Sequence, residues 1–113
     1  MLREVRILEL EALGPAPFAS MLLADLGADV ITVHRTVAAP TSDTAQGKLL
    51  DRGKRSIALD LKVPADTAIL KRLLPTADGL IEGFRPGVME RLGLSPEVCH
   101  KLCPKLVYGR MTG

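Results

Sequence analysis

Segments with strand-like composition alternate with segments of helical periodicity along this chain, and that alternation is the feature that most constrains the fold. The strand-like segments are residues 5–10, 29–34, 56–61, 78–83 and 105–110. Helical patterns occupy residues 18–26, 64–77 and 88–92, and a further helix opens at Ser95 as its N-cap. Strands that alternate with helices pair in parallel through right-handed crossovers. The sequence therefore predicts an α/β fold, a doubly wound parallel sheet of about five strands with helices between them.

The connection between the second and third expected strands is longer than the others. Residues 36–54 are rich in Ala, Pro, Thr, Ser, Asp and Gly and lack strong periodicity, which predicts a long, ligand-facing loop. If the strands take the common order 3-2-1-4-5, residues 15–27 provide most of the cover on one face of the sheet. A length of 113 residues suits one domain, so we expect residues 1–113 to form a single unit whose thinly covered face needs something else against it.

Charge and composition exclude several classes of protein. The chain has 15 basic and 13 acidic residues, and its formal charge of +2 gives no general attraction to nucleic acid or to a membrane surface. Its three aromatic residues do not alternate with a basic run, as they would in a base-stacking surface. Charged residues near the start exclude a signal peptide, and no window approaches the ~18 apolar residues of a membrane span. We therefore expect a cytoplasmic protein, or alternatively one of an organellar matrix, with no nucleic-acid or membrane partner.

Two cysteines, Cys99 and Cys103, stand four residues apart in a helical segment. This spacing places them on one face of the helix and does not make a disulfide framework. The neighbouring His100 suggests a metal site, but its side chain would point about 100° away from Cys99, and no fourth ligand is evident. We expect two small thiols that face the core, and no bound metal.

Three cations, Arg35, Lys62 and Arg85, follow three of the expected strands. The carboxyl ends of parallel strands meet at one edge of a sheet, and open α/β sheets bind their ligands there. Arg35 and Lys62 follow neighbouring strands and are expected to converge on one phosphorylated adenosine, whereas the forked guanidinium of Arg85 suits a pyrophosphate. A solvated arginine at a strand end is the alternative for Arg35. The sequence thus predicts a pocket for a phosphorylated ligand at this edge.

The kind of nucleotide can be narrowed from the turn after the first strand. Gly14 stands where a dinucleotide fingerprint would begin, but prolines at positions 15 and 17 replace the pattern G-x-G-x-x-G. The second strand also lacks a terminal acid that could hold a ribose diol. An NAD site is therefore not expected. NADP and coenzyme A would both satisfy an arginine at position 35.

Other charged residues have less specific interpretations. Arg91 can share the pyrophosphate only if the short helix turns back over the site, and otherwise is an exposed charge paired with Glu90 or a neighbour. Glu82 is either a buried carboxylate or, as is commoner, a strand-end residue that bonds a loop. Lys54 and Arg55 lie at the opposite edge and are expected to be solvated. Neither histidine has a nucleophile or a paired carboxylate at motif spacing, so we predict no catalytic residue in the chain.

A series of short motifs spans nearly the whole chain. The segments are Leu8–Leu10, Gly14–Phe18, Leu23–Val30, Arg52–Ser56, Leu59–Lys62, Arg85–Gly93 and Leu106–Gly113. Together and in this order they resemble the N-terminal part of the family III coenzyme A transferases, and most of all its α-methylacyl-CoA racemase branch. The chain departs from the usual family pattern in Ala16, His34 and Thr36, where a glycine, an acid and a proline are common.

The resemblance implies a Rossmann-like large domain, of which this chain is a part. Such a domain binds the adenosine and phosphates of an acyl-CoA, in dimers whose two chains interlock like links. Coenzyme A is then part of the substrate, and no separate cofactor is implied. By position, the adenosine and its 3′-phosphate would be contacted by Arg35, Ala58, Leu59, Asp60, Leu61 and Lys62. The pyrophosphate would be approached by Gly83, Phe84, Arg85 and Arg91.

The resemblance also implies a reaction. Racemases of this family remove the α-proton of a 2-methylacyl-CoA and return it on the other face through an enolate. Their bases, a histidine in a Gly-His-Asp segment and an acidic partner, lie beyond the strand that ends this chain, as does the aspartate that carries the acyl-CoA in the transferases. We expect the acyl-CoA-binding portion of a racemase, inactive in isolation. The alternatives are a portion of a CoA-transferase that moves CoA between carboxylic acids, and a truncated CoA-binding module without activity.

Overall fold

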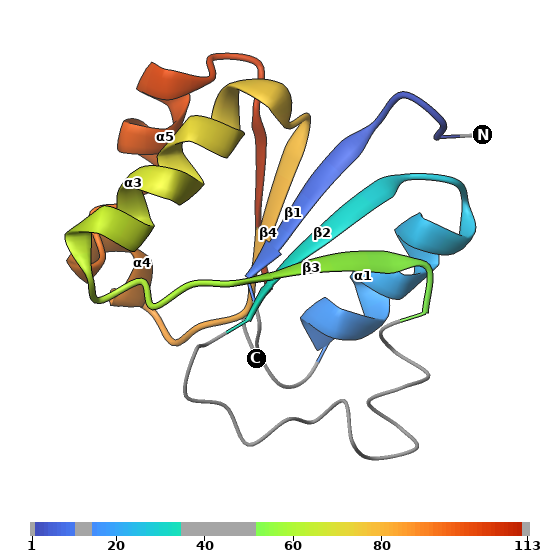
Figure 1. Ribbon diagram of the computed structural model, residues 1–113, viewed down its shortest axis with the longest axis horizontal. Helices are drawn as coiled ribbons and strands as arrows, with labels where there is room; N and C mark the ends of the chain where they lie inside the picture. Colours follow the sequence, from blue (N-terminus) through green and yellow to red (C-terminus); the bar gives the residue numbers. More distant parts are fainter. Residues whose placement is uncertain (1, 11–14, 35–51, 112–113) are drawn as a thin grey trace.

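Five parallel strands form the sheet at the centre of the computed structural model, in the order β3-β2-β1-β4-β5 (Figure 1). The structure describes residues 2–10, 15–34 and 52–111. The strands are β1 (Arg6–Leu10), β2 (Asp29–His34), β3 (Lys54–Ala58), β4 (Gly79–Glu82) and β5 (Val107–Arg110). Both the α/β fold class and the strand order agree with the sequence-based prediction.

The helices lie on the two faces of the sheet (Figure 1). They are α1 (Pro15–Asp25), α3 (Pro64–Leu73), the 3-10 turn η2 (Leu74–Thr76), α4 (Val88–Arg91) and α5 (Pro96–Leu102). The chain moves across the sheet in one direction from β1 to β2 and in the other direction from β3 to β4 and β5. Right-handed crossovers therefore place α1 on one face and the helices α3, α4 and α5 on the other. Within the described ranges α1 is the only helix on its face, and none of the helices there is long and apolar enough to cross a membrane.

Local signals set the helix ends. The Ser95 hydroxyl accepts a hydrogen bond of 3.3 Å from the Val98 amide, which confirms Ser95 as the N-cap of α5. Proline occupies the first position of both α3 and α5, where its missing N–H has no intrahelical partner to lose. Pro75 cannot donate to the preceding turn, so α3 ends at Leu73 and tightens into η2 instead of continuing to residue 77.

Two apolar clusters cover the two faces. The larger cluster packs Leu8 and Leu80, neighbours in the β1–β4 register, against Leu70 and Leu74 of the α3–η2 segment, all fully buried. Each such leucine contributes about 1.5–3 kcal/mol by leaving water. The smaller cluster, beneath α1, contains Ile7, Ala28 and Val30.

Both cysteines belong to the larger cluster, as predicted. The Sγ atoms of Cys99 and Cys103 lie 3.6 Å from the carbonyl oxygens of Leu94 and Ala77. Burial raises the pKa of the Cys99 thiol to about 11. Cys99 therefore stays a neutral thiol at physiological pH and serves the packing of α5 against the sheet.

The third strand differs from its prediction, since it spans Lys54–Ala58 and not residues 56–61. It ends early because the Asp60 amide and carboxylate are committed to a turn with Asp66 and Lys62. It begins early because two charged residues, Lys54 and Arg55, find acidic partners on β1 and β2. The expected loop 36–54 lies mostly outside the described residues, and its last residue, Lys54, belongs to β3.

Candidate functional site

The carboxyl edge of the sheet contains a topological switch point. The central strand β1 pairs with β2 on one side and with β4 on the other. The chain leaves β1 toward α1 on one face and leaves β4 toward α4 on the opposite face. Ligands of open α/β sheets bind where the connections diverge in this way. The described loops at this edge are residues 59–63, after β3, and 83–87, after β4.

Hydrogen bonds fix the loop 59–63. The Asp60 amide donates to the carboxylate of Asp66 at 2.8 Å, and the Asp60 carboxylate accepts from the Lys62 amide at 3.0 Å. The Thr67 hydroxyl donates to the carbonyl of Leu61 at 2.9 Å. The loop backbone is thus held by the first turns of α3 and needs no ligand to order it.

The residues predicted to contact adenosine in this loop differ in exposure. Ala58 and Lys62 are exposed, whereas Leu59 is 4% exposed and belongs to the larger core cluster. Leu61 is partly buried against the same cluster. A ligand at this loop would therefore meet the backbone, Ala58 and the Lys62 ammonium, because the side chain of Leu59 is already in the core. Arg35, the predicted partner of Lys62, lies outside the described residues.

The loop 83–87 leads from β4 into α4. Gly83 and Phe84 are partly buried, and Phe84 packs against the larger core cluster, whereas Arg85 is exposed. Gly87 is the N-cap of α4 with a φ of 88°, a left-handed conformation that favours glycine. This conformation turns the chain sharply from the loop into the helix.

Arg91 returns to the same loop through α4. Its amide donates to the carbonyl of Gly87 at 3.1 Å. A Cβ placed on Gly87 would lie 3.8 Å from Nη1 of Arg91, so the guanidinium sits beside the loop. The short helix therefore turns back as the pyrophosphate hypothesis requires. Glu90, the alternative partner for Arg91, bonds Arg110 at 2.7 Å, and that hydrogen bond lowers the pKa of Glu90.

Three cations at this edge remain available. Lys62, Arg85 and Arg91 are exposed, and none of them forms an ion pair with a carboxylate of the described chain. In contrast, Arg110 on β5 is committed to two carboxylates. Exposed cations that form no ion pair leave their charge for an anionic ligand.

Glu82 proves to be both a buried carboxylate and a residue that bonds a loop. Only 4% of its side chain is exposed, and it accepts from the Phe84 amide at 3.0 Å and from Nε of Arg110 at 3.2 Å. The Arg110 guanidinium also stacks on the Tyr108 ring, with 5.4 Å to the centroid. Sequence reasoning did not single out Arg110. The available signal was its place opposite Glu82 in the parallel register.

The prediction that Lys54 is solvated is wrong. Its side chain is 2% exposed, and Nζ donates to Oε1 of Glu9 at 2.8 Å and to the carbonyl of Pro17 at 3.1 Å. Thr32, opposite Glu9 in the register, donates its hydroxyl to the same Oε1 at 3.0 Å. The long side chain of Lys54 crosses β2 and reaches Glu9. It supplies the positive charge that the buried carboxylate of Glu9 needs. This buried pair connects three strands to the first turn of α1.

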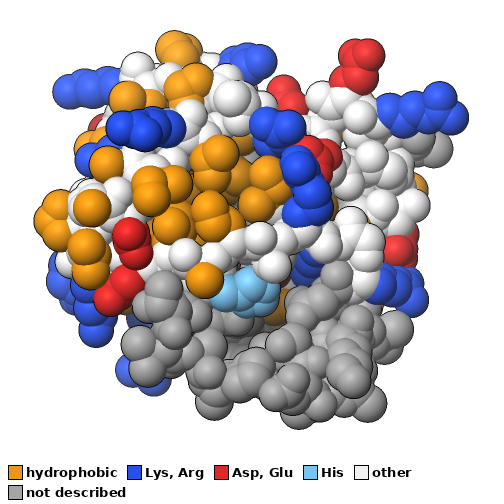
Figure 2. Space-filling view, viewed as in Figure 1, with side chains coloured by type: hydrophobic (Ala, Val, Ile, Leu, Met, Phe, Trp, Pro, Cys, Tyr) orange, Lys and Arg blue, Asp and Glu red, His pale blue; other side chains and the backbone are white. Residues whose placement is uncertain are grey.

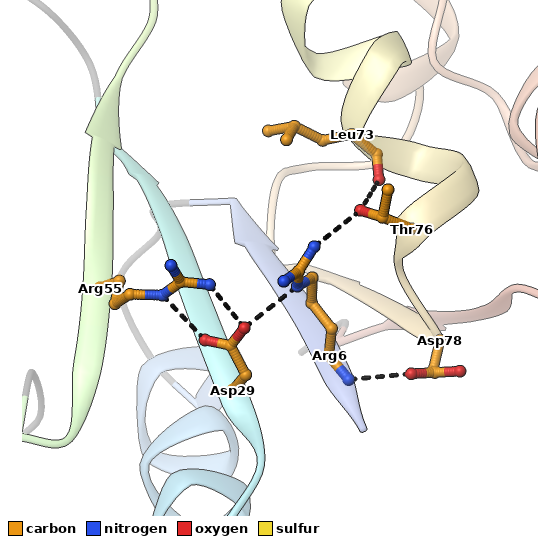
Figure 3. A network of polar contacts seen from close by, with 6 residues as sticks. All are labelled: Arg6, Asp29, Arg55, Leu73, Thr76 and Asp78. Carbon is orange, nitrogen blue, oxygen red and sulfur yellow. Dashed lines mark hydrogen bonds and ion pairs between the residues drawn. The ribbon is translucent and has the colours of Figure 1, made fainter. Parts of the chain in front are cut away.

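Arg55 is exposed, as predicted, and belongs to a polar cluster away from the carboxyl edge (Figure 3). Its Nε and Nη2 donate to Asp29 at 2.9 and 2.5 Å, and Nε of Arg6 donates to the same carboxylate at 3.0 Å. Arg6 also reaches the Thr76 hydroxyl at 3.0 Å through Nη1, and its amide bonds Asp78. Hydrogen bonds from Arg55 above all, and also from Arg6, lower the pKa of Asp29. The cluster ties β1, β2 and β3 to η2 and takes no part in the candidate site.

Relatives of known function share the whole length of this chain. The family model for CoA-transferase family III matches residues 2–113. The α-methylacyl-CoA racemases of Mus musculus and Homo sapiens are 47% and 46% identical to it over 113 and 112 residues, which is 100% and 99% of this chain and 28% of each racemase. Succinyl-CoA–D-citramalate CoA-transferase of Chloroflexus aurantiacus is 40% identical over 126 residues, 99% of this chain and 30% of that enzyme.

Solved structures agree in fold. The crystal structure of Rv3272 from Mycobacterium tuberculosis superposes with a TM-score of 0.88 at 35% identity, over 99% of this chain and 33% of that one. A CAIB/BAIF family protein from Brucella suis gives 0.83 at 32% identity, with the same coverage. The chain spans about a third or less of the length of these relatives. With a family match along nearly its whole length, a shared fold and cations free at the carboxyl edge, the chain belongs to CoA-transferase family III.

Proposed function

We propose that this chain is the acyl-CoA-binding portion of an α-methylacyl-CoA racemase, an isomerase that epimerises C2 of a 2-methylacyl-CoA. The observation that carries the proposal is the set of exposed, unpaired cations at the carboxyl edge, Lys62, Arg85 and Arg91. The racemase branch is favoured by the 47% identity to the mouse racemase, against 40% to the citramalate CoA-transferase.

In the proposed complex the two loops divide the coenzyme A between them. Lys62, with Arg35, holds the 3′-phosphate of the adenosine beside the ordered loop 59–63. Arg85 and Arg91 hold the pyrophosphate from the loop 83–87, where a forked guanidinium can contact two phosphate oxygens. The thioester then extends from this edge toward groups outside the chain. There one base removes the α-proton, the electron pair moves onto the thioester oxygen as an enolate, and a second base returns a proton on the other face.

A CoA-transferase portion is the second candidate, because the transferase relatives share the same segment. Both functions need the same coenzyme A contacts, so the edge described above serves either. They differ in the group that acts on the acyl end, which is a pair of bases in a racemase and a nucleophilic aspartate in a transferase. A CoA-binding module without activity is the non-enzyme alternative.

The proposal is tested by comparing coenzyme A with dephospho-coenzyme A. A charge-assisted hydrogen bond to the 3′-phosphate contributes about 1.5–3 kcal/mol, or roughly 10- to 150-fold in affinity. The 113-residue chain should therefore bind coenzyme A that much more tightly in titration calorimetry, and Arg35→Ala should remove the difference. Arg72→Ala, which changes an exposed arginine of α3, is the matched control and should leave it unchanged. Equal affinity of the unmutated chain for the two ligands contradicts the proposal.

We also propose that the chain self-associates, as a homodimer or a larger assembly. Phe18 and Leu22 of α1 and Leu26, in the turn directly after it, recur every four residues on one side, and they are 53%, 45% and 45% exposed. On β5, Val107 is 72% exposed. Figure 2 shows a further gathering of hydrophobic side chains beside α3, with Lys and Arg side chains along one border. Apolar surfaces of this kind favour contact with another chain.

A further inference from the structure

We propose that Glu82 is a positioning residue of the coenzyme A site, acting through the loop 83–87 that carries Arg85. The inference rests on the proposed function, in which the loop 83–87 binds the pyrophosphate. Glu82 is proposed to keep that loop ordered. Glu82 touches no ligand in this proposal. It fixes the position of the backbone from which the Arg85 side chain extends.

The two carboxylate oxygens of Glu82 have different partners. Oε2 accepts from the amide of Phe84, the residue immediately before Arg85, at 3.0 Å. Oε1 accepts from Nε of Arg110 at 3.2 Å. With 4% of the side chain exposed, water competes little for either oxygen. The loop backbone is therefore attached to the end of β4 one residue before the arginine.

Arg110 extends this attachment to the far end of the loop. Its Nη2 donates to Oε2 of Glu90 in α4 at 2.7 Å, while its Nε bonds Glu82. One guanidinium from β5 thus joins the residue before the loop to a residue in the helix after it. We call Glu82, Arg110 and Glu90 the loop clamp.

The loop clamp matters for binding because a loose loop must be ordered when a ligand arrives. Ordering the backbone of a loop costs conformational entropy, and a clamped loop has met that cost before binding. The side chain of Arg85 is exposed and makes no ion pair within the described part of the chain, so its reach is governed by its backbone. Loosening the loop should therefore weaken coenzyme A binding through Arg85 specifically.

The test is a double-mutant cycle between Glu82→Gln and Arg85→Ala, read by calorimetric affinity for coenzyme A. Glutamine keeps the size of the side chain but has no negative charge, and its NH2 group cannot accept a hydrogen bond. It therefore cannot replace both carboxylate oxygens, one of which accepts from the Phe84 amide and the other from Arg110. We expect Glu82→Gln to weaken binding about tenfold, the scale of one hydrogen bond to a charged group. In the Arg85→Ala background the same change should have little further effect, because the cation that the loop positions is gone. Glu90→Gln is the matched control, since it loses the exposed end of the clamp but keeps the Phe84 contact, and should weaken binding less than threefold.

Hydrogen exchange of the Phe84 amide reports the order of the loop independently of coenzyme A binding. It should be protected in the unmutated chain and exchange faster in Glu82→Gln, whether or not coenzyme A binds. Equal losses of affinity with and without Arg85, or unchanged exchange at Phe84, would overturn the clamp. Absence of coenzyme A binding by the unmutated chain would instead overturn the proposed function. If Glu82→Gln does not fold, Arg110→Lys replaces it, because lysine keeps the charge beside Glu82 and loses the fork that joins the two carboxylates.

Discussion

At the residue scale, the buried pair of Lys54 and Glu9 is the most consequential contact that the sequence did not predict. Each side chain is 2% exposed, so both charges have left water. Their mutual attraction, the Thr32 hydroxyl and the Pro17 carbonyl offset that desolvation. Neither residue looks paired in the sequence, because the partners are 45 residues apart and meet only when β3 takes its place beside β2.

Breaking this pair from one side should be costly. Lys54→Met removes the cation and leaves the Glu9 carboxylate buried without compensation, which should lower the free energy of unfolding by about 3–5 kcal/mol. Urea unfolding measures the loss. Arg52→Met is the control, because it removes an exposed partner of Asp25 in the same part of the chain and should cost far less. Similar losses in the two variants would mean that the buried pair has no special role.

Some residues of the candidate site could be placed from the sequence, and others could not. Lys62 and Arg85 could be placed at the carboxyl edge from the sequence, because a strand end fixes where the next residue stands. The return of Arg91 to the loop could not, since it depends on the left-handed turn at Gly87 and on Glu90 being bonded elsewhere. The sequence allowed two interpretations of Glu82, a buried carboxylate and a strand-end residue that bonds a loop. Both are correct, because Glu82 is buried and accepts a hydrogen bond from the Phe84 amide.

At the element scale, three strands are joined at their amino-terminal half by Asp29. This carboxylate lies between the guanidinium groups of Arg6 and Arg55, from β1 and β3 (Figure 3). The edge strand β3 therefore gains a side-chain tie besides its backbone pairing with β2. About a third of the Asp29 side chain is exposed, so water screens the interaction and we expect its contribution to be modest.

The Asp29 tie should depend on pH in a defined direction. Its folded pKa is lowered, so the tie is fully present above the pKa of an unfolded aspartate, about 3.9, and is lost as pH falls through the folded pKa. Asp29→Asn should thus be less stable than the unmutated chain at pH 7, and the difference should shrink between about pH 5 and pH 2. Thermal melting of both chains across this range measures it. If the difference in stability between the two chains stays constant down to pH 2, the charge of the Asp29 carboxylate is not what stabilises the fold.

The errors in the predicted elements also have local causes. The pattern of residues 64–77 predicts one helix, but Pro75 lacks the N–H that the next turn needs. The third strand was placed at 56–61 because its apolar residues lie there, whereas the sheet recruits the charged Lys54 and Arg55 through their partners. Periodicity locates an element, and contacts made across the fold decide its ends.

At the scale of the whole molecule, the alternation of strands and helices predicted a doubly wound parallel sheet, and the order of its strands is the common one that the sequence analysis considered. The alternation also predicted a thinly covered face, but which side chains stay exposed there depends on the packing of the described residues. The side of α1 that carries Phe18 and Leu22, continued by Leu26 in the next turn, is the clearest case.

This surface makes self-association measurable. The chain should run as a dimer or larger species in light scattering at micromolar concentration, and Leu22→Glu should shift it toward the monomer by placing a charge in the apolar stripe. Ile69→Glu, on the exposed side of α3 and 38% exposed, is the matched control and should shift it less. A chain that is monomeric at every concentration, with or without the substitution, would contradict the proposal.

Arg110 lies on β5, which follows α4 and α5 in the chain, whereas the loop it holds comes before them. During synthesis on the ribosome, Arg85 and its loop are made first and wait for β5 to pair with β4. A nascent chain without β5 would display Arg85 on a segment lacking its guanidinium anchor, even with the other four strands in place. On the proposed function, the coenzyme A edge would therefore be complete only once β5 has paired with β4.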